Sequence, residues 1–108
     1  MVSLTLRDAQ HVCWKTLRMI NDRIEPEKGR MWTPLVTIAD LRASCENVAQ
    51  FAELEKLEEQ KNAIQTRSLA AALSDVLYAV FVLAEHYKLN IEDVFMETIN
   101  DRMIAHLH

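Results

Sequence analysis

Apolar residues recur every three or four positions in the first part of the chain, which is the period of an amphipathic helix. Thr5 and Asp8 have the spacing of a capping box, in which each side chain accepts a hydrogen bond from the other residue's backbone N–H. Pro26 cannot continue a helix, so the run ends before it. Its apolar positions are Leu6, Ala9, Cys13, Leu17, Ile20 and Ile24. The pattern predicts a first helix over residues 6–24.

A second helix is predicted to begin at Pro34. Residues 25–32 combine a proline, the only glycine and alternating charges, which is typical of a loop. Thr33 then offers a hydroxyl at the N-cap position, and Pro34 suits the first helical position. The apolar positions that follow are Leu35, Ile38, Leu41, Cys45, Val48 and Ala52. This helix either continues towards Asn62 or breaks within residues 58–62.

Two further helices follow. Ser68 is the expected N-cap of the third, and residues 69–87 are apolar on nearly every side, which is typical of a central helix. Asn90 and Asp93 have capping-box spacing, and the helical period continues to about Leu107. The pattern predicts an all-α, four-helix fold that occupies residues 1–108 as one domain.

The apolar third helix predicts self-association. A domain of 108 residues has little interior, so part of this helix is expected to face a second copy of the chain. We expect a homo-oligomer that forms through the second and third helices. Ser74 and Asp75 interrupt the apolar stretch before it reaches the ~20 residues that a bilayer needs, so no membrane span is expected.

Composition and charge exclude several other classes of function. One glycine and two prolines exclude glycine-rich phosphate loops. The net charge of -4, with no dense basic cluster, argues against binding of duplex nucleic acid. Two cysteines are too few for a disulfide scaffold, and the N-terminus resembles no secretory or mitochondrial leader. We expect a cytoplasmic protein.

Asp75 is the first candidate for chemistry, because an unpaired carboxylate is costly to bury in an apolar helix. One interpretation is a structural aspartate that is satisfied by an arginine or a helix N-terminus. The other is a ligand for a hard cation such as Mg²⁺.

The second half of the chain resembles the MazG-type nucleotide pyrophosphohydrolases. Residues 68–84, SLAAALSDVLYAVFVLA, and 88–95, KLNIEDVF, resemble that family's E-L-x-D-V-L helix and the G-I-D-L-E-E-A-F-like turn after it. Residues 32–52 resemble the preceding helix, which carries E-E-x-x-E after an aromatic-x-P-L start. The resemblance implies an all-α fold and a site for a nucleoside triphosphate.

The resemblance also implies a Mg²⁺ site made of carboxylates from two facing helices. The ion would neutralise the phosphates and position the water that attacks between the α and β phosphates. Asp75 matches the last acidic position, but Ala72 stands where the family has glutamate.

Two registers are possible on the second helix. One places Ala43, Ser44 and Asn47 at the family's acidic positions, and the other places Glu46, Asn47 and Gln50 there. The candidate metal ligands are therefore Asp75 and Glu46, with weak or absent Mg²⁺ binding. Ser44 and Asn47 are candidate nucleotide-binding residues, together with Arg102, which replaces the family's phosphate-binding lysine.

Two functions follow from this resemblance. The first is a non-hydrolytic MazG-like homologue with a depleted metal site, which binds a nucleotide or interacts with a protein. The alternative is an active Mg²⁺-dependent nucleoside triphosphate pyrophosphohydrolase that uses a sparse site.

Overall fold

The computed structural model describes residues 4–23, 32–57 and 63–107. This part of the chain forms helices α1 (Leu6–Arg23), α3 (Pro34–Leu57), α4 (Ala63–His86) and α5 (Ile91–Leu107). It contains no strand, so the predicted all-α class with four helices is confirmed. Residues 25–31 of the expected loop and the expected break over residues 58–62 lie outside the described residues.

Local sequence signals fix three helix starts. The Asp8 N–H donates to Thr5 Oγ1 at 3.1 Å and the Thr5 N–H donates to Asp8 Oδ2 at 3.3 Å, which completes the predicted capping box. α3 begins at Pro34, as predicted. The Asp93 N–H donates to Asn90 Oδ1 at 3.4 Å, directly at the start of α5.

The predicted start of the third helix is wrong. α4 begins at Ala63, so Ser68 lies inside the helix and is not its N-cap. Residues 63–67 contain neither glycine nor proline, and serine is tolerated within a helix when packing supports it. The helix ends at His86, and Lys88 then adopts a left-handed backbone with φ 57°.

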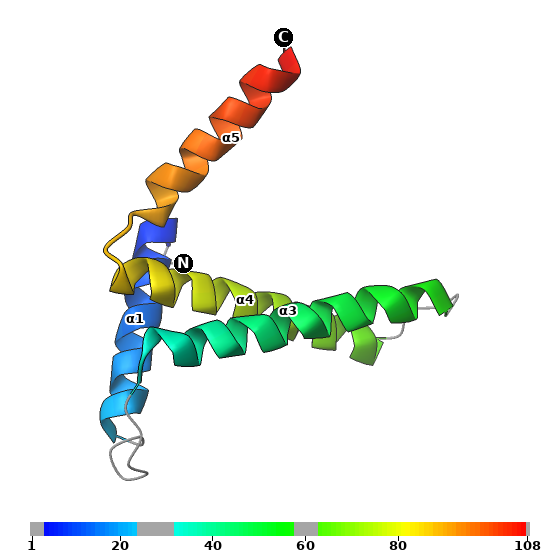
Figure 1. Cartoon of the computed structure of the whole chain (residues 1–108), viewed down its shortest axis with the longest axis horizontal. Coiled ribbons are helices and arrows are strands. Elements are labelled where there is room, and N and C mark those ends of the chain that lie inside the picture. The colour runs from blue at the N-terminus through cyan, green and yellow to red at the C-terminus, as the bar shows by residue number, and fades with distance from the viewer. Residues whose placement is uncertain (1–3, 24–31, 58–62, 108) are drawn as a thin grey trace.

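α4 is the central helix, as predicted. α3 and α4 run side by side in opposite directions, and α1 crosses them at one end, so that α4 packs against both (Figure 1). Among the described residues, every buried apolar side chain belongs to α4. These side chains are Ala72, Ala79, Phe81, Val82 and Ala84.

The face that α3 turns inward agrees only in part with the predicted apolar stripe, of which Ile38, Leu41 and Val48 are half-buried. Leu35 is 72% exposed and Cys45 is also exposed, whereas Thr37 and Ser44 are buried. Tertiary packing thus outweighs simple hydrophobicity at these positions. Ser44 is thereby turned towards α4.

Within the described residues, one segment is long and apolar enough to cross a membrane by length and composition, residues Arg67–His86 of α4. The core helix of a water-soluble protein meets the same criterion. α4 packs against α1 and α3, but only 22% of this segment is buried within one copy of the chain.

Candidate functional site

A hollow of about 390 Å³ lies beside the contact between α3 and α4, and we call it the α3–α4 hollow. It brings together Ser44 and Asp75, two of the residues that the sequence singled out. Ser44 is 8% exposed, whereas Asp75 is exposed and has no hydrogen bond or ion pair to another described residue. Within one copy of the chain, Asp75 is thus not a buried structural aspartate.

A second carboxylate, that of Asp40, lines the same hollow. Sequence reasoning missed this residue, because the family motif has no acidic position there. The available signal was its spacing, since Asp40 lies one helical turn before Ser44 and therefore shares its face of α3. The hollow carries a carboxylate from each of its two main helices.

Aromatic side chains form another part of the lining. Trp32 and Tyr78 both face the hollow, and Trp32 Nε1 donates a 2.9 Å hydrogen bond to Thr37 Oγ1. The Trp14 ring meets the Trp32 ring edge-on, with ring centroids 5.5 Å apart. The His86 ring also packs against the Trp32 ring, with a centroid distance of 5.2 Å. These contacts hold the Trp32 indole in place at the start of α3.

Burial raises the pKa values of two neighbouring groups. It is the main cause of the raised pKa of Tyr78, and the negative charges of a Cys13 thiolate and of Asp40 raise this pKa further. Burial also raises the pKa of Cys13. Tyr78 therefore offers a neutral hydroxyl, and Cys13 is a poor nucleophile at neutral pH.

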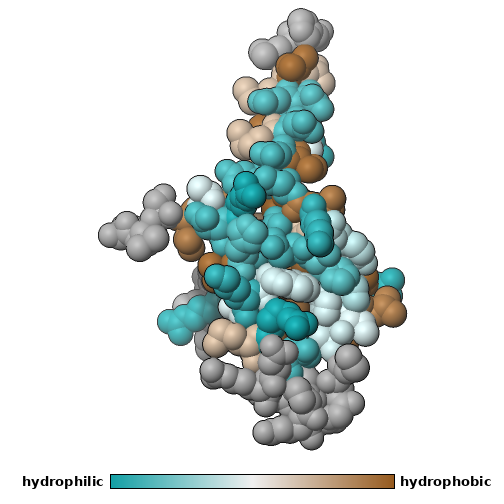
Figure 2. Space-filling model, turned by 90° about the vertical axis from the view of Figure 1, so that its left-hand side faces the viewer, coloured by the Kyte–Doolittle hydropathy of each residue, from teal (hydrophilic) through white to brown (hydrophobic). Residues whose placement is uncertain are grey.

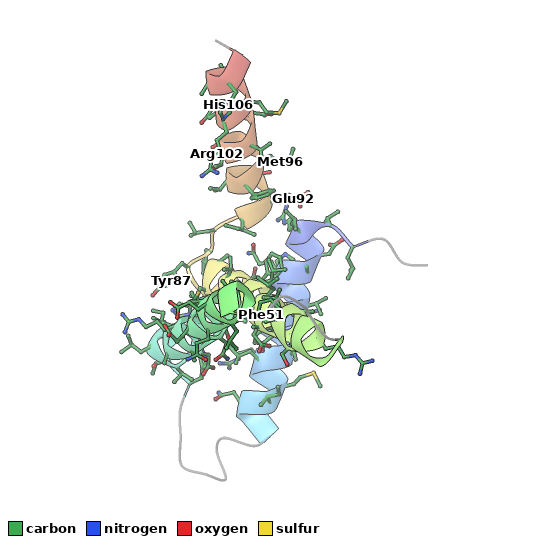
Figure 3. All side chains as sticks on the ribbon, turned by 90° about the vertical axis from the view of Figure 1, so that its right-hand side faces the viewer. Phe51, Tyr87, Glu92, Met96, Arg102 and His106 are labelled. Carbon is green, nitrogen blue, oxygen red and sulfur yellow. The ribbon has the colours of Figure 1, made fainter. Side chains whose placement is uncertain are left out.

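The other candidate residues lie elsewhere. Glu46 and Asn47 are exposed on α3 and do not line the hollow. Arg102 is exposed on α5, which projects away from the other helices (Figure 3). Of the two possible registers, the structure places Ala43 and Ser44 of the first at the hollow and no residue of the second.

The α3–α4 hollow offers two carboxylates as oxygen donors. Among the described residues, no group of three His, Cys, Asp or Glu side chains could hold a metal ion. Asp40 and Asp75 supply hard oxygen donors, and Mg²⁺ is commonly held by one or two carboxylates together with substrate phosphates. Ala72, at the family's glutamate position, is 6% exposed and does not line the hollow.

A larger hollow of about 560 Å³ lies between α1 and the turn from α4 to α5. Its charged lining is mixed, with Arg7, His11 and Lys88 beside Glu85. His11 Nδ1 lies 2.9 Å from Glu85 Oε1. None of the candidate residues from the sequence lines this second hollow.

Comparison of the chain with protein-family models, curated proteins and solved structures finds no match. The resemblance to MazG-type enzymes therefore rests on the sequence motifs alone.

Proposed function

We propose that the chain is a MazG-like module that binds a nucleotide in the α3–α4 hollow without hydrolysing it. The observation that carries the proposal is the lining of this hollow, which combines the aromatic rings of Trp32 and Tyr78 with the carboxylates of Asp40 and Asp75. Its volume of about 390 Å³ lies within the range of small-molecule sites.

The chemistry of the lining suits the base and the sugar of a nucleotide. Aromatic side chains stack on bases, and carboxylates accept hydrogen bonds from ribose hydroxyls and from exocyclic amino groups. Among the described residues, neither lysine nor arginine lines the hollow, and its two carboxylates repel free phosphates. We therefore place the phosphates outside the hollow.

Loss of hydrolysis is proposed from the residues at the family's acidic positions. Ser44, Asn47 and Ala72 are neutral, and each missing carboxylate removes one charged ligand for Mg²⁺. A weakly held ion gives little stabilisation to the charge that develops on the phosphates during cleavage.

The alternative, an active pyrophosphohydrolase, is favoured by one observation. Asp40 adds a second carboxylate to Asp75 at the same hollow. Together with the nucleotide's phosphates, these two residues would hold Mg²⁺, which when bound neutralises phosphate charge and activates water. In that case Arg102 would contact the phosphates from α5 of another copy, since the α5 of its own chain projects away from α3 and α4 (Figure 3).

Calorimetric titration with nucleosides and nucleotides tests the binding proposal. Asp75→Asn should weaken binding about tenfold, the effect of losing a charged hydrogen-bond acceptor. Asp101→Asn, the same change at an exposed site on α5, is the matched control and should leave the affinity unchanged. Equal affinities of both variants and the unmodified chain would contradict the assigned site.

Release of pyrophosphate from a panel of (d)NTPs, with Mg²⁺ or Mn²⁺, separates the two functions. The non-hydrolytic module binds nucleotides but releases no pyrophosphate above a control without protein. Rapid release that is abolished by EDTA and by Asp75→Asn would establish the alternative.

Self-association through α3 and α4 also remains part of the proposal. Leu54 on α3 and Leu73 and Leu77 on α4 are about half exposed in one copy of the chain. Such leucines favour an interface with a second copy or with another protein. We expect this assembly to be cytoplasmic, without a membrane or duplex nucleic acid as partner.

A further inference from the structure

Helix α5 exposes a stripe of large apolar side chains. Phe95, Ile99 and Met103 follow one another at intervals of one helical turn, and Met96 lies on the same side. Their side chains are between 36 and 57% exposed. In Figure 2 apolar and polar side chains alternate along this projecting helix. We call these four residues the α5 stripe.

The first turn of α5 is fixed in a direction that leads away from the helix pair α3 and α4. The buried Gln10 side chain accepts a 3.3 Å hydrogen bond from the Ile91 N–H and donates one of 2.8 Å to the Leu89 carbonyl. The Arg7 N–H donates to Glu92 Oε2 at 3.0 Å. With its base tied to α1, α5 projects away from its own α3 and α4 (Figure 1).

An isolated helix of this kind is poorly stabilised. α5 has 17 residues, and helices of such length depend on tertiary packing of an apolar face for most of their stability. The α5 stripe therefore requires a covering surface.

The area available for burial matches that of an obligate oligomer. The chain exposes 8835 Å², roughly 2,600 Å² more than the ~6,200 Å² expected of a compact monomer of its mass. Its radius of gyration is 17.1 Å, whereas a compact domain of this length has about 13 Å. Obligate homodimers bury about 1,000–2,500 Å² on each copy.

The charges of α5 argue against a membrane surface as the covering partner. Its acidic residues outnumber its single arginine, and interfacial helices that bind anionic lipid are rich in lysine and arginine. The acidic residues are Glu92, Asp93, Glu97 and Asp101.

We infer that a second copy of the chain covers the α5 stripe, so that α5 is an assembly arm. This interface adds α5 to the α3 and α4 surface already proposed for self-association, and it requires no nucleotide. Each copy carries both the uncovered α5 stripe and exposed leucines on α3 and α4. The stripe of one copy therefore has an apolar surface to pack against on the other copy.

Sedimentation equilibrium of the full chain tests this inference. At micromolar concentration the unmodified chain should show a molar mass of at least twice 12.5 kDa. Ile99→Lys should raise the dissociation constant at least tenfold, because it places a charge in the apolar interface. Glu97→Lys, on the opposite side of the same helix, is the matched control and should retain the assembly.

Hydrogen exchange of the unmodified chain gives a second test that does not depend on how the variants fold. Backbone amides of α5 should be protected at high protein concentration and should lose protection on dilution. A monomer of 12.5 kDa, or an oligomer in which α5 amides are unprotected, would overturn the inference. Asp75→Asn should weaken nucleotide binding without changing the assembly, so the two proposals can fail separately.

Discussion

Gln10 on α1 and Glu85 on α4 join the three helices that meet at the turn before α5. Gln10 Nε2 donates to Glu85 Oε2 at 2.7 Å, and the other oxygen of Glu85 lies 2.9 Å from His11 Nδ1. Gln10 is 3% exposed, and its amide bonds to the last turn of α4, to the connecting turn and to the first residue of α5. One buried side chain thus fixes where α5 points.

Replacement of Gln10 should therefore destabilise the protein strongly. Gln10→Ala leaves the Leu89 carbonyl and the Ile91 N–H without this partner, and we expect the free energy of unfolding to fall by about 2–4 kcal/mol. Urea denaturation at a fixed protein concentration measures the change. Gln50→Ala, at an exposed position of α3, should change it by less than about 0.5 kcal/mol. Equal effects of both substitutions would contradict the role of Gln10.

Lys88 offers a stabilising substitution. Its φ of 57° lies in the left-handed region, and the Leu89 N–H donates to the Ala84 carbonyl at 2.8 Å, as in a Schellman helix end. Glycine adopts this conformation without the steric cost of a Cβ atom. Lys88→Gly should raise the free energy of unfolding by about 0.5–1 kcal/mol. Lys88→Ala keeps the Cβ atom and should give no such gain in the same denaturation measurement.

The raised pKa of Tyr78 predicts a loss of stability in alkali. Burial first, then the charges of Cys13 and Asp40, raise the folded-state pKa above the unfolded value of about 10. Below pH 10 the Tyr78 hydroxyl keeps its proton in both the folded and the unfolded state, so its titration does not change the free energy of unfolding. As the pH rises further, the unfolded state loses its proton first, and the free energy of unfolding falls. Tyr78→Phe should reduce this fall between pH 9 and pH 11.

The exposed Tyr87 provides the control for this experiment, since Tyr87→Phe makes the same chemical change outside the hollow. An alkaline slope that stays the same in Tyr78→Phe would contradict the assignment.

The starts of α1, α3 and α5 were predictable because their signals are local. The capping box at Thr5, the N-cap at Asn90 and the proline at position 34 act within one helical turn, so the sequence alone reveals them. The length of apolar sequence around Val82 likewise identified α4 as central. Ser68 misled the prediction because a serine signals a helix start only when no helix precedes it.

The arrangement of the candidate site depended on long-range packing, which a residue pattern does not encode. The apolar pattern of α3 predicted that Cys45 faces the core. In the structure Cys45 is exposed, and the packing of α3 against α4 buries Ser44 instead. The same fit brings Asp40 to the hollow, where no motif marked it. The direction of α5, and hence the position of Arg102, depends on the buried amide of Gln10.

Ser44→Asp should convert the α3–α4 hollow into a better metal site. It adds a third carboxylate to those of Asp40 and Asp75, and carboxylate oxygens are the ligands that Mg²⁺ and Mn²⁺ prefer. Calorimetric titration should show tighter binding of Mn²⁺ than in the unmodified chain. Without metal the variant should be less stable, because Ser44 is 8% exposed and the three charges repel one another.

Asn47→Asp is the matched control for this prediction, because it adds the same carboxylate to an exposed position of α3 outside the hollow. It should leave both the affinity for Mn²⁺ and the stability without metal nearly unchanged, since exposed charges interact weakly in water. An equal gain in affinity in both variants would show that added surface charge alone attracts the ion. A gain confined to Ser44→Asp, reversed when Asp75 is also changed to Asn, would place the ion between α3 and α4.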